Sequence, residues 1–262
     1  MKKLHAFLLA GLLPLMPMSA PATAATDDLA AIQKAGTLRI GTEGTYAPFS
    51  YHNSSNELVG FDVDIGRAVA KQLGVKPDFI EGKWDGLIAG LNANRYDVVI
   101  NQVGITPERQ AKFDFSKPYI SSKAVLIVRS DNDNIKNFDD IKGKRSANTL
   151  TSNFGKLAQQ HGAEVVPVQG FNEAISLLTT GRVDATINDY LSFLDFKKQQ
   201  PQAAVKVVAS DDSAEYSQSG VLMRKDQTAL REAIDQALAA IKTDGTYQAI
   251  SERYFGVDVS KP

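Results

Sequence analysis

Cysteine is absent from this 262-residue chain, and neither sign of charge is in excess. Without cysteine no disulfide can support the core, and no lipid-modified cysteine is expected to anchor the protein. The 29 basic and 30 acidic residues leave a formal net charge of −1. A chain with no basic excess has little with which to neutralise phosphates, so we do not expect it to bind nucleic acid.

Motifs for metals and phosphates are also missing. His52 and His161 lie far apart in the sequence and have no metal-ligand spacing. The segment Gly41–Gly44 lacks the glycine spacing of a dinucleotide-binding or P-loop signature. We therefore expect no metal site and no cofactor.

The first 25 residues have the pattern of a cleavable secretion signal. Lys2 and Lys3 precede an apolar stretch at 6–18, and small residues follow at 21–25. The apolar stretch is shorter than the roughly 20 residues that span a bilayer, which argues against a membrane anchor. We expect cleavage after residue 24 or 25, and a mature protein exported to a bacterial periplasm without a lipid anchor.

What the chain does contain is an α/β pattern. Its hydrophobic content of 43% is typical of a globular protein, and its length allows two domains of about 100–150 residues. Strand and helix patterns alternate in two series, which predicts βαβ units and parallel sheet. The predicted strands are 37–41, 77–80, 96–100, 124–128, 164–168 and 184–187, and the predicted helices are 61–74, 87–91, 153–160, 172–180 and two within 227–255, separated at Asp244–Gly245.

Two segments of the chain match one another. Residues 91–101 read L-N-A-N-R-Y-D-V-V-I-N, and residues 178–188 read L-T-T-G-R-V-D-A-T-I-N. Coincidence, or two similar units within one sheet, would also give such a match, but the two series favour two similar lobes that face one another. Ligands of open α/β sheets bind beyond the carboxyl ends of the strands. This predicts Asn101–Gln102 and Asn188–Asp189 at the mouth of a shared cleft.

Several motifs occur in an order that is typical of one family. They are G-T-Y-A-P-F at 44–49, G-F-D-V-D at 60–64, I-T-P-E-R at 105–109, F-D-F-S-K-P-Y at 113–119, I-K-G-K at 141–144, G-R-V-D-A at 181–185 and D-G-T-Y at 244–247. Over nearly the whole mature chain the sequence resembles the extracellular solute-binding proteins of polar amino-acid ABC importers (family 3). The segments K-W-D-G at 83–86 and V-V-I-N-Q-V at 98–103 resemble its cystine-binding branch.

The resemblance implies a type II periplasmic binding protein fold, in which each of two lobes is a mostly parallel sheet flanked by helices. Two crossover strands, near 121–124 and 218–221, would form the hinge. The first lobe would comprise 26–120 and 219–262, and the second lobe 121–218. The implied partners are a free amino acid and the membrane permease of an ABC importer, and a monomer is expected.

A free amino acid presents a carboxylate, which a guanidinium can hold through two parallel hydrogen bonds. Arg109 matches the family arginine of the I-T-x-x-R motif, although a solvated helix residue is the alternative. Ser152 and Asn153 stand at the start of the predicted helix 153–160, where free backbone amides attract anions. The family uses this position for the same carboxylate. A simple N-cap is the alternative, and both roles can hold together.

The ligand's ammonium requires an anion, and Asp189 is the candidate. Its alternative role is to cap a helix that begins at Tyr190. The backbone carbonyl of Asn101 and groups near Gly104 or Thr106 could complete the ammonium contacts. Some relatives have serine or threonine at the position of Gly104, so a side-chain contact is missing here.

Specificity is expected from the pocket for the ligand's side chain. Tyr46 and Trp84 match aromatic positions that flank the ligand in relatives, although Trp84 could instead cover the first core. Glu43, Gln102 and Phe154 are further candidates. Glu43 could meet a distal ammonium, as in cystine or a basic amino acid, or it could be a solvated loop residue.

The resulting prediction is a receptor without enzymatic activity that captures an amino acid, with L-cystine as the best guess, and delivers it to a permease. The alternative is an enzyme, because periplasmic cyclohexadienyl dehydratases are built on the same fold. Glu43 or Glu173 would then be the general acid. A sensor domain is a third class.

Overall fold

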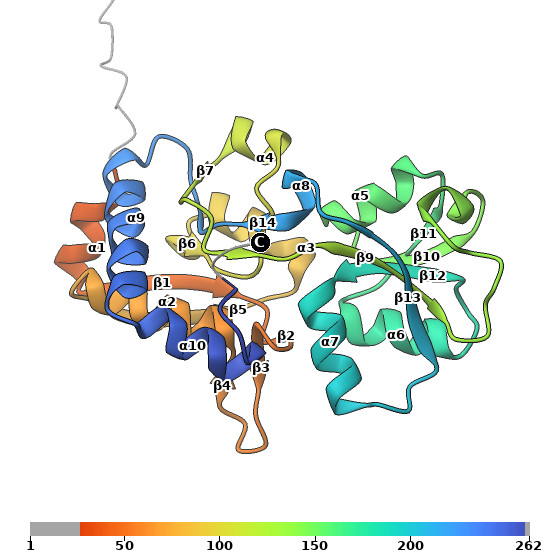
Figure 1. The fold of residues 1–262 in the computed structure, drawn as a ribbon. Coiled ribbons are helices and arrows are strands. Elements are labelled where there is room, and N and C mark those ends of the chain that lie inside the picture. The colour runs from red at the N-terminus through yellow and green to blue at the C-terminus, as the bar shows by residue number, and fades with distance from the viewer. Residues whose placement is uncertain (1–26, 260–262) are drawn as a thin grey trace, which may run out of the picture.

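The computed structural model describes residues 27–259, which form two lobes connected by extended strands (Figure 1). The predicted leader at 1–25 lies outside the described residues. Within 27–259, no helix combines the length and the apolar character needed to cross a bilayer.

The first lobe is built on a five-stranded sheet in the order β5-β1-β6-β15-β7. The strands β5, β1 and β6 are parallel, whereas β15 runs antiparallel to both of its neighbours. Their bounds are Lys76–Glu81 for β5, Thr37–Thr42 for β1, Val98–Val99 for β6, Leu222–Met223 for β15 and Asp114–Phe115 for β7.

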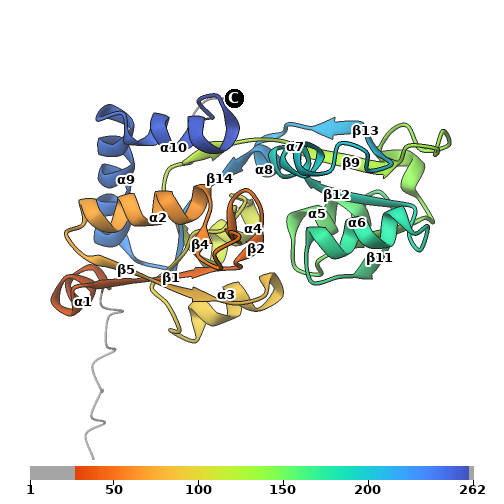
Figure 2. The ribbon, with the colours of Figure 1, turned by 90° about the horizontal axis from the view of Figure 1, so that it is seen from below.

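Helices cover both faces of this sheet (Figure 2). On one face Phe61 and Ile65 share a core with Ile40 of β1 and with the two C-terminal helices. On the other face Leu87 and Leu91 pack with the strands β6 and β15. The helices are α2 (Phe61–Gln72), α9 (Thr228–Thr243) and α10 (Thr246–Phe255) on the first face and α3 (Trp84–Asn92) on the second, with shorter helices α1 (Leu29–Ala35) and α4 (Pro107–Lys112).

The second lobe repeats this plan with the order β11-β10-β12-β9-β13. Again three strands are parallel, and β9 runs antiparallel to β12 and β13. The helices α5 and α6 contact β10 and β12, and separate cores contain Leu157 of α5 and Ile175 of α6. The bounds are β9 Ala124–Arg129, β10 Arg145–Asn148, β11 Glu164–Pro167, β12 Ala185–Asp189, β13 Val205–Asp211, α5 Asn153–Gln160, α6 Phe171–Thr179 and α7 Tyr190–Gln199.

The predicted α/β fold of two similar lobes is confirmed, and each sheet is mostly parallel: only β15 in the first sheet and β9 in the second run against the other four strands. The two matching segments, 91–101 and 178–188, make equivalent contacts in the two lobes. The carboxylate of Asp97 accepts the N–H of Arg39 at 2.9 Å, and that of Asp184 accepts the N–H of Arg145 at 2.9 Å. In return each aspartate's N–H donates to the carbonyl of the same arginine. Each match thus fixes the central strand of its sheet to the strand beside it.

Short elements connect the two sheets. The strands β8 (Ile120–Ser121) and β14 (Gln218–Ser219) pair antiparallel, so the two chain crossings lie side by side. The predicted boundaries at 120/121 and 218/219 fall within this pair and stay a proposal. Elements that the sequence did not indicate include a small sheet of β2 (Thr45–Tyr46), β3 (Ser50–His52) and β4 (Leu58–Val59), a 3-10 helix (Phe138–Ile141) and α8 (Ala214–Ser217).

Candidate functional site

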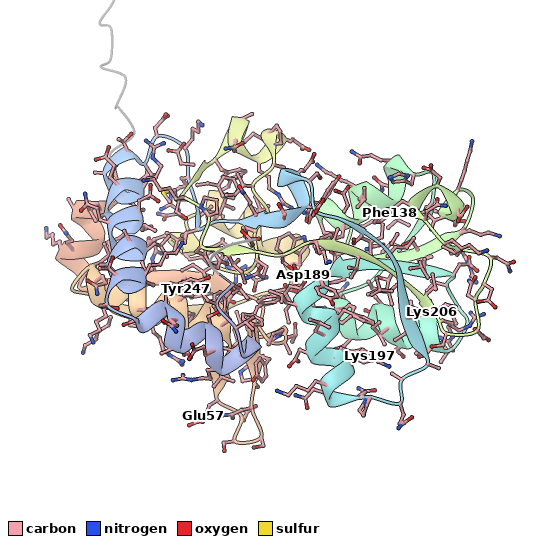
Figure 3. The ribbon with its side chains drawn as sticks, viewed as in Figure 1. Glu57, Phe138, Asp189, Lys197, Lys206 and Tyr247 are labelled. Carbon is pink, nitrogen blue, oxygen red and sulfur yellow. The ribbon has the colours of Figure 1, made fainter. Side chains whose placement is uncertain are left out.

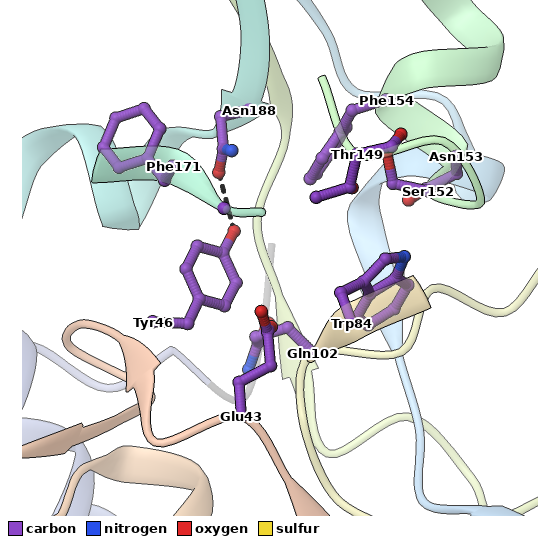
Figure 4. Close-up of a pocket in the computed structure, with 11 residues that line it drawn as sticks. Glu43, Tyr46, Trp84, Gln102, Thr149, Ser152, Asn153, Phe154, Phe171 and Asn188 are labelled. Carbon is purple, nitrogen blue, oxygen red and sulfur yellow. Dashed lines mark hydrogen bonds between the residues drawn. The ribbon is translucent and has the colours of Figure 1, made fainter. Parts of the chain in front are cut away.

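A cavity with about 390 Å³ of empty space lies between the lobes (Figure 4). The first lobe contributes Glu43, Tyr46, Trp84 and Gln102 to its lining. The second lobe contributes Thr149, Ser152, Asn153, Phe154, Gly170, Phe171 and Asn188. The lining therefore combines four aromatic rings with a carboxylic acid, amides and hydroxyls.

A second, narrower cavity adjoins the first and shares Tyr46, Gln102, Asn153 and Phe154 with it. Its lining adds Gly104 and Asp189. Figure 3 places Asp189 between the two lobes. All but three of the predicted site residues therefore line one or both cavities. The exceptions are Asn101, Thr106 and Arg109, which lie in the wall behind them.

The side chain of Asn101 is fully buried and organises this wall. Its Oδ1 accepts hydrogen bonds from the N–H of Glu43 at 2.8 Å and from the hydroxyls of Thr42 and Ser50 at 3.0 and 3.1 Å. Its Nδ2 donates to Oε2 of Glu43 at 2.6 Å. Asn101 therefore joins the end of β6 to the end of β1 and fixes Glu43 in the cavity wall. Burial raises the pKa of Glu43 to about 7.

Gln102 adopts a left-handed conformation, with φ of 51°. Its backbone N–H and its Nε2 both donate to the carboxylate of Asp62, each at 2.8 Å, and the Tyr119 hydroxyl donates to the same carboxylate at 3.1 Å. Asp62 is fully buried, and burial raises its pKa to about 7. Asp62 lies within the G-F-D-V-D motif, but no pattern in the sequence marked it as a site residue.

Arg109 is held in the wall as a cation without an anionic partner. Thr106 caps α4 and accepts the N–H of Arg109 at 3.2 Å. The guanidinium donates to the carbonyls of Gly104 at 3.0 Å and Thr151 at 3.3 Å, and it stacks over the Trp84 ring at 5.4 Å. Only 8% of the residue is exposed, and burial lowers its pKa to about 10. No carboxylate within 27–259 forms an ion pair with it, so the site favours an incoming anion.

Gly104 permits the close approach of the two lobes at this point. A Cβ atom placed on Gly104 would lie 2.9 Å from Nδ2 of Asn153 in the second lobe. A larger residue would displace Asn153 from the start of α5. The side-chain amide of Asn153 from the second lobe thus occupies the space that a side chain at residue 104 would need.

The N-terminus of α5 faces the same region. The Ser152 hydroxyl accepts the N–H of Gly155 at 3.0 Å and donates to the carbonyl of Thr149 at 3.0 Å, so Ser152 is the helix cap. Ser152, Asn153 and Phe154 all line the main cavity. The cap that was predicted from the sequence is confirmed, and it leaves the first amides of the helix without intrahelical partners, an arrangement that stabilises anions.

Asp189 caps a helix and also faces a cavity. Its Oδ1 accepts the N–H groups of Leu191 at 2.8 Å and Ser192 at 3.3 Å, which caps α7. At the same time Asp189 lines the second cavity. Burial raises its pKa to about 6. An ammonium group in this cavity would lie close to the carboxylate of Asp189, which forms no ion pair with another described residue.

Thr149 and Phe171 line the main cavity but were not predicted from the sequence. Asn188 was predicted at the mouth of the cleft together with Asp189, though not as a ligand contact, and it lines the main cavity. Phe171 begins α6, one residue before the predicted helix, and closes the pocket opposite Tyr46 (Figure 4). Thr149 had no recognisable pattern. These residues reach the cavity because the second lobe closes on the first.

Direct hydrogen bonds hold the lobes together. The Tyr46 hydroxyl donates to Oδ1 of Asn188 at 2.7 Å. The Ser192 hydroxyl donates to the carbonyl of Ala47 at 3.0 Å. Both hydrogen bonds join the first lobe to the second, so the cleft between the lobes is closed.

Residues 38–257 match the model of the bacterial extracellular solute-binding proteins, family 3. The chain belongs to this family. It is 45% identical over 233 residues to the L-cystine-binding protein TcyA of Bacillus subtilis, which covers 88% of this chain and 86% of that protein. It is 42% identical over 230 residues to a probable amino-acid ABC transporter-binding protein of Haemophilus influenzae, with 88% and 89% covered.

Solved structures of similar proteins share the fold. An ancestral arginine-binding protein bound to arginine is 40% identical and superposes with a TM-score of 0.78 over 84% of this chain and 99% of that one. The ancestral amino acid-binding protein AncCDT-1, a precursor of cyclohexadienyl dehydratase, is 34% identical with a TM-score of 0.78 over 88% and 100%.

The L-cystine solute receptor of Neisseria gonorrhoeae in its unliganded open conformation is 45% identical, yet its TM-score is only 0.60 over 89% and 99%. The more similar sequence superposes less well than the arginine-bound ancestor. This difference agrees with the closed arrangement of the lobes in the present chain.

Proposed function

We propose that this solute-binding protein captures a free amino acid between its lobes and delivers it to the permease of an ABC importer. One observation carries the proposal: the buried carboxylate of Asp189 in the second lobe lines the second cavity, and the buried guanidinium of Arg109 in the first lobe lies behind Gly104, which lines the same cavity. An α-amino acid carries the complementary pair of charges on one carbon. Neither charge is neutralised by an ion pair within the described residues, so a zwitterion offers both a partner.

In this proposal the ligand's carboxylate binds Arg109 and the first amides of α5. Its ammonium binds Asp189, and Gly104, Asn153 and Gln102 line the space between the two ends. Binding then stabilises the closed form, because only the closed form brings both lobes to the ligand. Closure would present a defined surface to the permease.

The proposed cargo is L-cystine. Tyr46, Trp84, Phe154 and Phe171 supply aromatic surface for a sulfur-containing chain. Glu43 stands at the border between the main cavity and an open one of about 930 Å³ that is also lined by Glu81 and Glu173. A distal ammonium that extends toward this opening would meet carboxylates. The high identity to two proteins named for cystine supports the same cargo.

We also propose lobes of 26–120 with 219–262 and of 121–218, a monomer in solution, and a location outside the cytoplasm after removal of the leader. The twelve predicted residues are proposed as the binding site, with Asn101 and Thr106 supporting it from behind and Asn188 and Phe171 added to it.

A thermal-shift screen of residues 26–262 against the common amino acids, cystine and prephenate-like acids tests the proposal. Specific ligands raise the melting temperature by mass action. We expect a large shift with cystine and recovery of the compound unchanged. A shift with a different amino acid would support the receptor function but show that the ligand is that amino acid and not cystine. Turnover of a cyclohexadienyl acid, with Glu43 as general acid, would replace the receptor by an enzyme.

A further inference from the structure

The carboxylate of Asp85 crosses the cleft and holds one segment of the second lobe. Asp85 lies in the first turn of α3, directly after Trp84. Its Oδ1 accepts the N–H of Thr151 at 2.9 Å and the hydroxyl of Thr151 at 2.8 Å. Its Oδ2 lies 3.4 Å from the N–H of Leu150. Three donors of one short segment therefore converge on one carboxylate of the opposite lobe.

We propose that Asp85 is a latch for lobe closure that also positions the anion-binding start of α5. The contact joins α3 of the first lobe to the segment between β10 and α5 of the second, so it exists only when the cleft is closed. Hydrogen bonds to an ionised acceptor are stronger than neutral ones. Opening replaces them by water, and the closed population therefore depends on Asp85.

The position of Thr151 explains the link to the ligand site. Its N–H and hydroxyl are held by Asp85, while its carbonyl accepts a hydrogen bond from Arg109. The next residue, Ser152, is the cap of α5. Asp85 thus sets the distance between Arg109 and the first amides of α5, the two groups that are proposed to hold the ligand's carboxylate. Asp85 does not line either cavity, so it acts as a positioning residue.

A second charged contact between the lobes provides a matched control. Lys156 of α5 pairs with Glu108 of α4. The side chains of Glu108 and Lys156 are 58% and 42% exposed, and both are long and flexible. Ion pairs between two long exposed side chains contribute little, because ordering both side chains offsets the attraction. Asp85 is exposed too, but its short side chain accepts from backbone N–H groups. Glu108→Gln therefore removes a carboxylate that also faces the other lobe, with little expected effect on closure.

The first test needs no ligand, so it is independent of the proposed amino-acid function. Since the chain lacks cysteine, Thr45→Cys and Asn172→Cys introduce two unique labelling sites that border one open cavity. Double electron–electron resonance measures the distance between the two spin labels, which becomes shorter when the lobes close. We expect Asp85→Ala to shift the ligand-free distribution toward longer distances, with Asp85→Asn between it and wild type. The Glu108→Gln distribution should match wild type. An unchanged distribution in Asp85→Ala overturns the latch.

The second test uses radiolabelled L-cystine and rests on the proposed function. We expect dissociation from Asp85→Ala to be about tenfold faster, with association within about twofold of wild type. Thr151→Val removes one of the three donors and should give a smaller increase. Equal melting temperatures of the ligand-free variants would show that faster dissociation does not result from a less stable fold. Dissociation at the wild-type rate in Asp85→Ala overturns the positioning role. Failure of the wild type to bind cystine would refute the cargo, while the distance measurement still decides on the latch.

Discussion

The hydroxyl of Tyr46 and the side-chain carbonyl of Asn188 meet across the cleft at 2.7 Å (Figure 4). Tyr46 follows the end of β1, and Asn188 lies near the end of β12, so the bond connects the carboxyl ends of strands in the two sheets. Because both residues line the cavity, this contact closes one side of it.

Tyr46→Phe removes this hydrogen bond and keeps the aromatic surface. We expect cystine affinity to fall by about 1 kcal/mol, because one hydrogen bond of the closed form is lost. Isothermal titration calorimetry measures the change. Tyr51→Phe on the neighbouring strand β3, outside both cavities, is the control. An affinity equal to wild type would mean that the bond does not contribute to closure.

Arg109→Ala should weaken amino-acid binding by about 2–5 kcal/mol, since it leaves a desolvated ligand carboxylate without its charged partner. Arg109→Lys keeps the charge but loses the paired geometry, so an intermediate loss is expected. The exposed Arg95→Ala serves as the control for net charge. Near-wild-type calorimetric affinity of Arg109→Ala would remove this residue from the proposed site.

The pH dependence of binding should report on Asp189, whose pKa burial raises to about 6. The ligand's ammonium requires the carboxylate form, so the contribution of Asp189 to affinity should be constant above this pKa. Below it, protons compete with the ligand and affinity falls by up to about tenfold per pH unit. Titrations at pH 7.5 and pH 5, in buffers of different ionisation enthalpy, would detect the accompanying proton release. In Asp189→Asn we expect weak binding that no longer follows this profile.

The buried Asp62 should make stability depend on pH in the opposite sense to an ion-paired carboxylate. Its pKa is raised from 3.8 to about 7 in the folded state. Between about pH 4 and pH 7 the folded chain therefore binds more protons than the unfolded chain, and the free energy of unfolding decreases as pH rises. Each pKa unit corresponds to about 1.4 kcal/mol. Above about pH 7 this contribution levels off.

Asp62→Asn should reduce that slope, as measured by urea unfolding between pH 4.5 and pH 8. The exposed Asp212→Asn should retain it. Glu43, whose pKa is also raised to about 7, contributes a second part of the slope. An identical slope in wild type and Asp62→Asn would show that Asp62 ionises freely in the folded chain.

Gly60→Ala should destabilise the first lobe. Gly60 has φ of 135°, and a Cβ there would lie 2.2 Å from the carbonyl oxygen of Phe49. We expect a loss above about 1 kcal/mol, visible as a lower melting temperature. Gly86→Ala in α3 meets no atom within 4 Å, so it should be neutral or slightly stabilising. A stable Gly60→Ala would mean that this turn can change its conformation.

Local patterns were enough to predict the elements that bury one regular face or carry a cap. The apolar face of α2 and the Ser152 cap of α5 are examples, and both helices begin at or near the predicted residue. Strand direction was harder to predict. The strands β9 and β15 are antiparallel to their neighbours because of the path of the chain between the lobes, and their own sequences have no antiparallel pattern. The short strands β2–β4 bury too few residues to produce a periodic pattern.

The site residues likewise include some that a local sequence pattern predicts and others that it does not. Arg109 and Asp189 stand out because burial of a charge demands a partner and because their motifs are distinctive. The hydrogen bonds of Asp62 to Gln102 and of Asp85 to Thr151 join residues 40 and 66 positions apart. Such contacts depend on how helices and lobes pack, and a single sequence contains no local trace of them.

The pairing of β8 with β14 has a mechanical consequence. Two separate linkers would let the lobes swivel, slide and bend independently, whereas two strands bonded side by side form a narrow ribbon. A ribbon bends easily about one axis but resists shear, because shear would break its cross-strand bonds. The lobes are then expected to move along one coordinate, which is the bending angle of this ribbon.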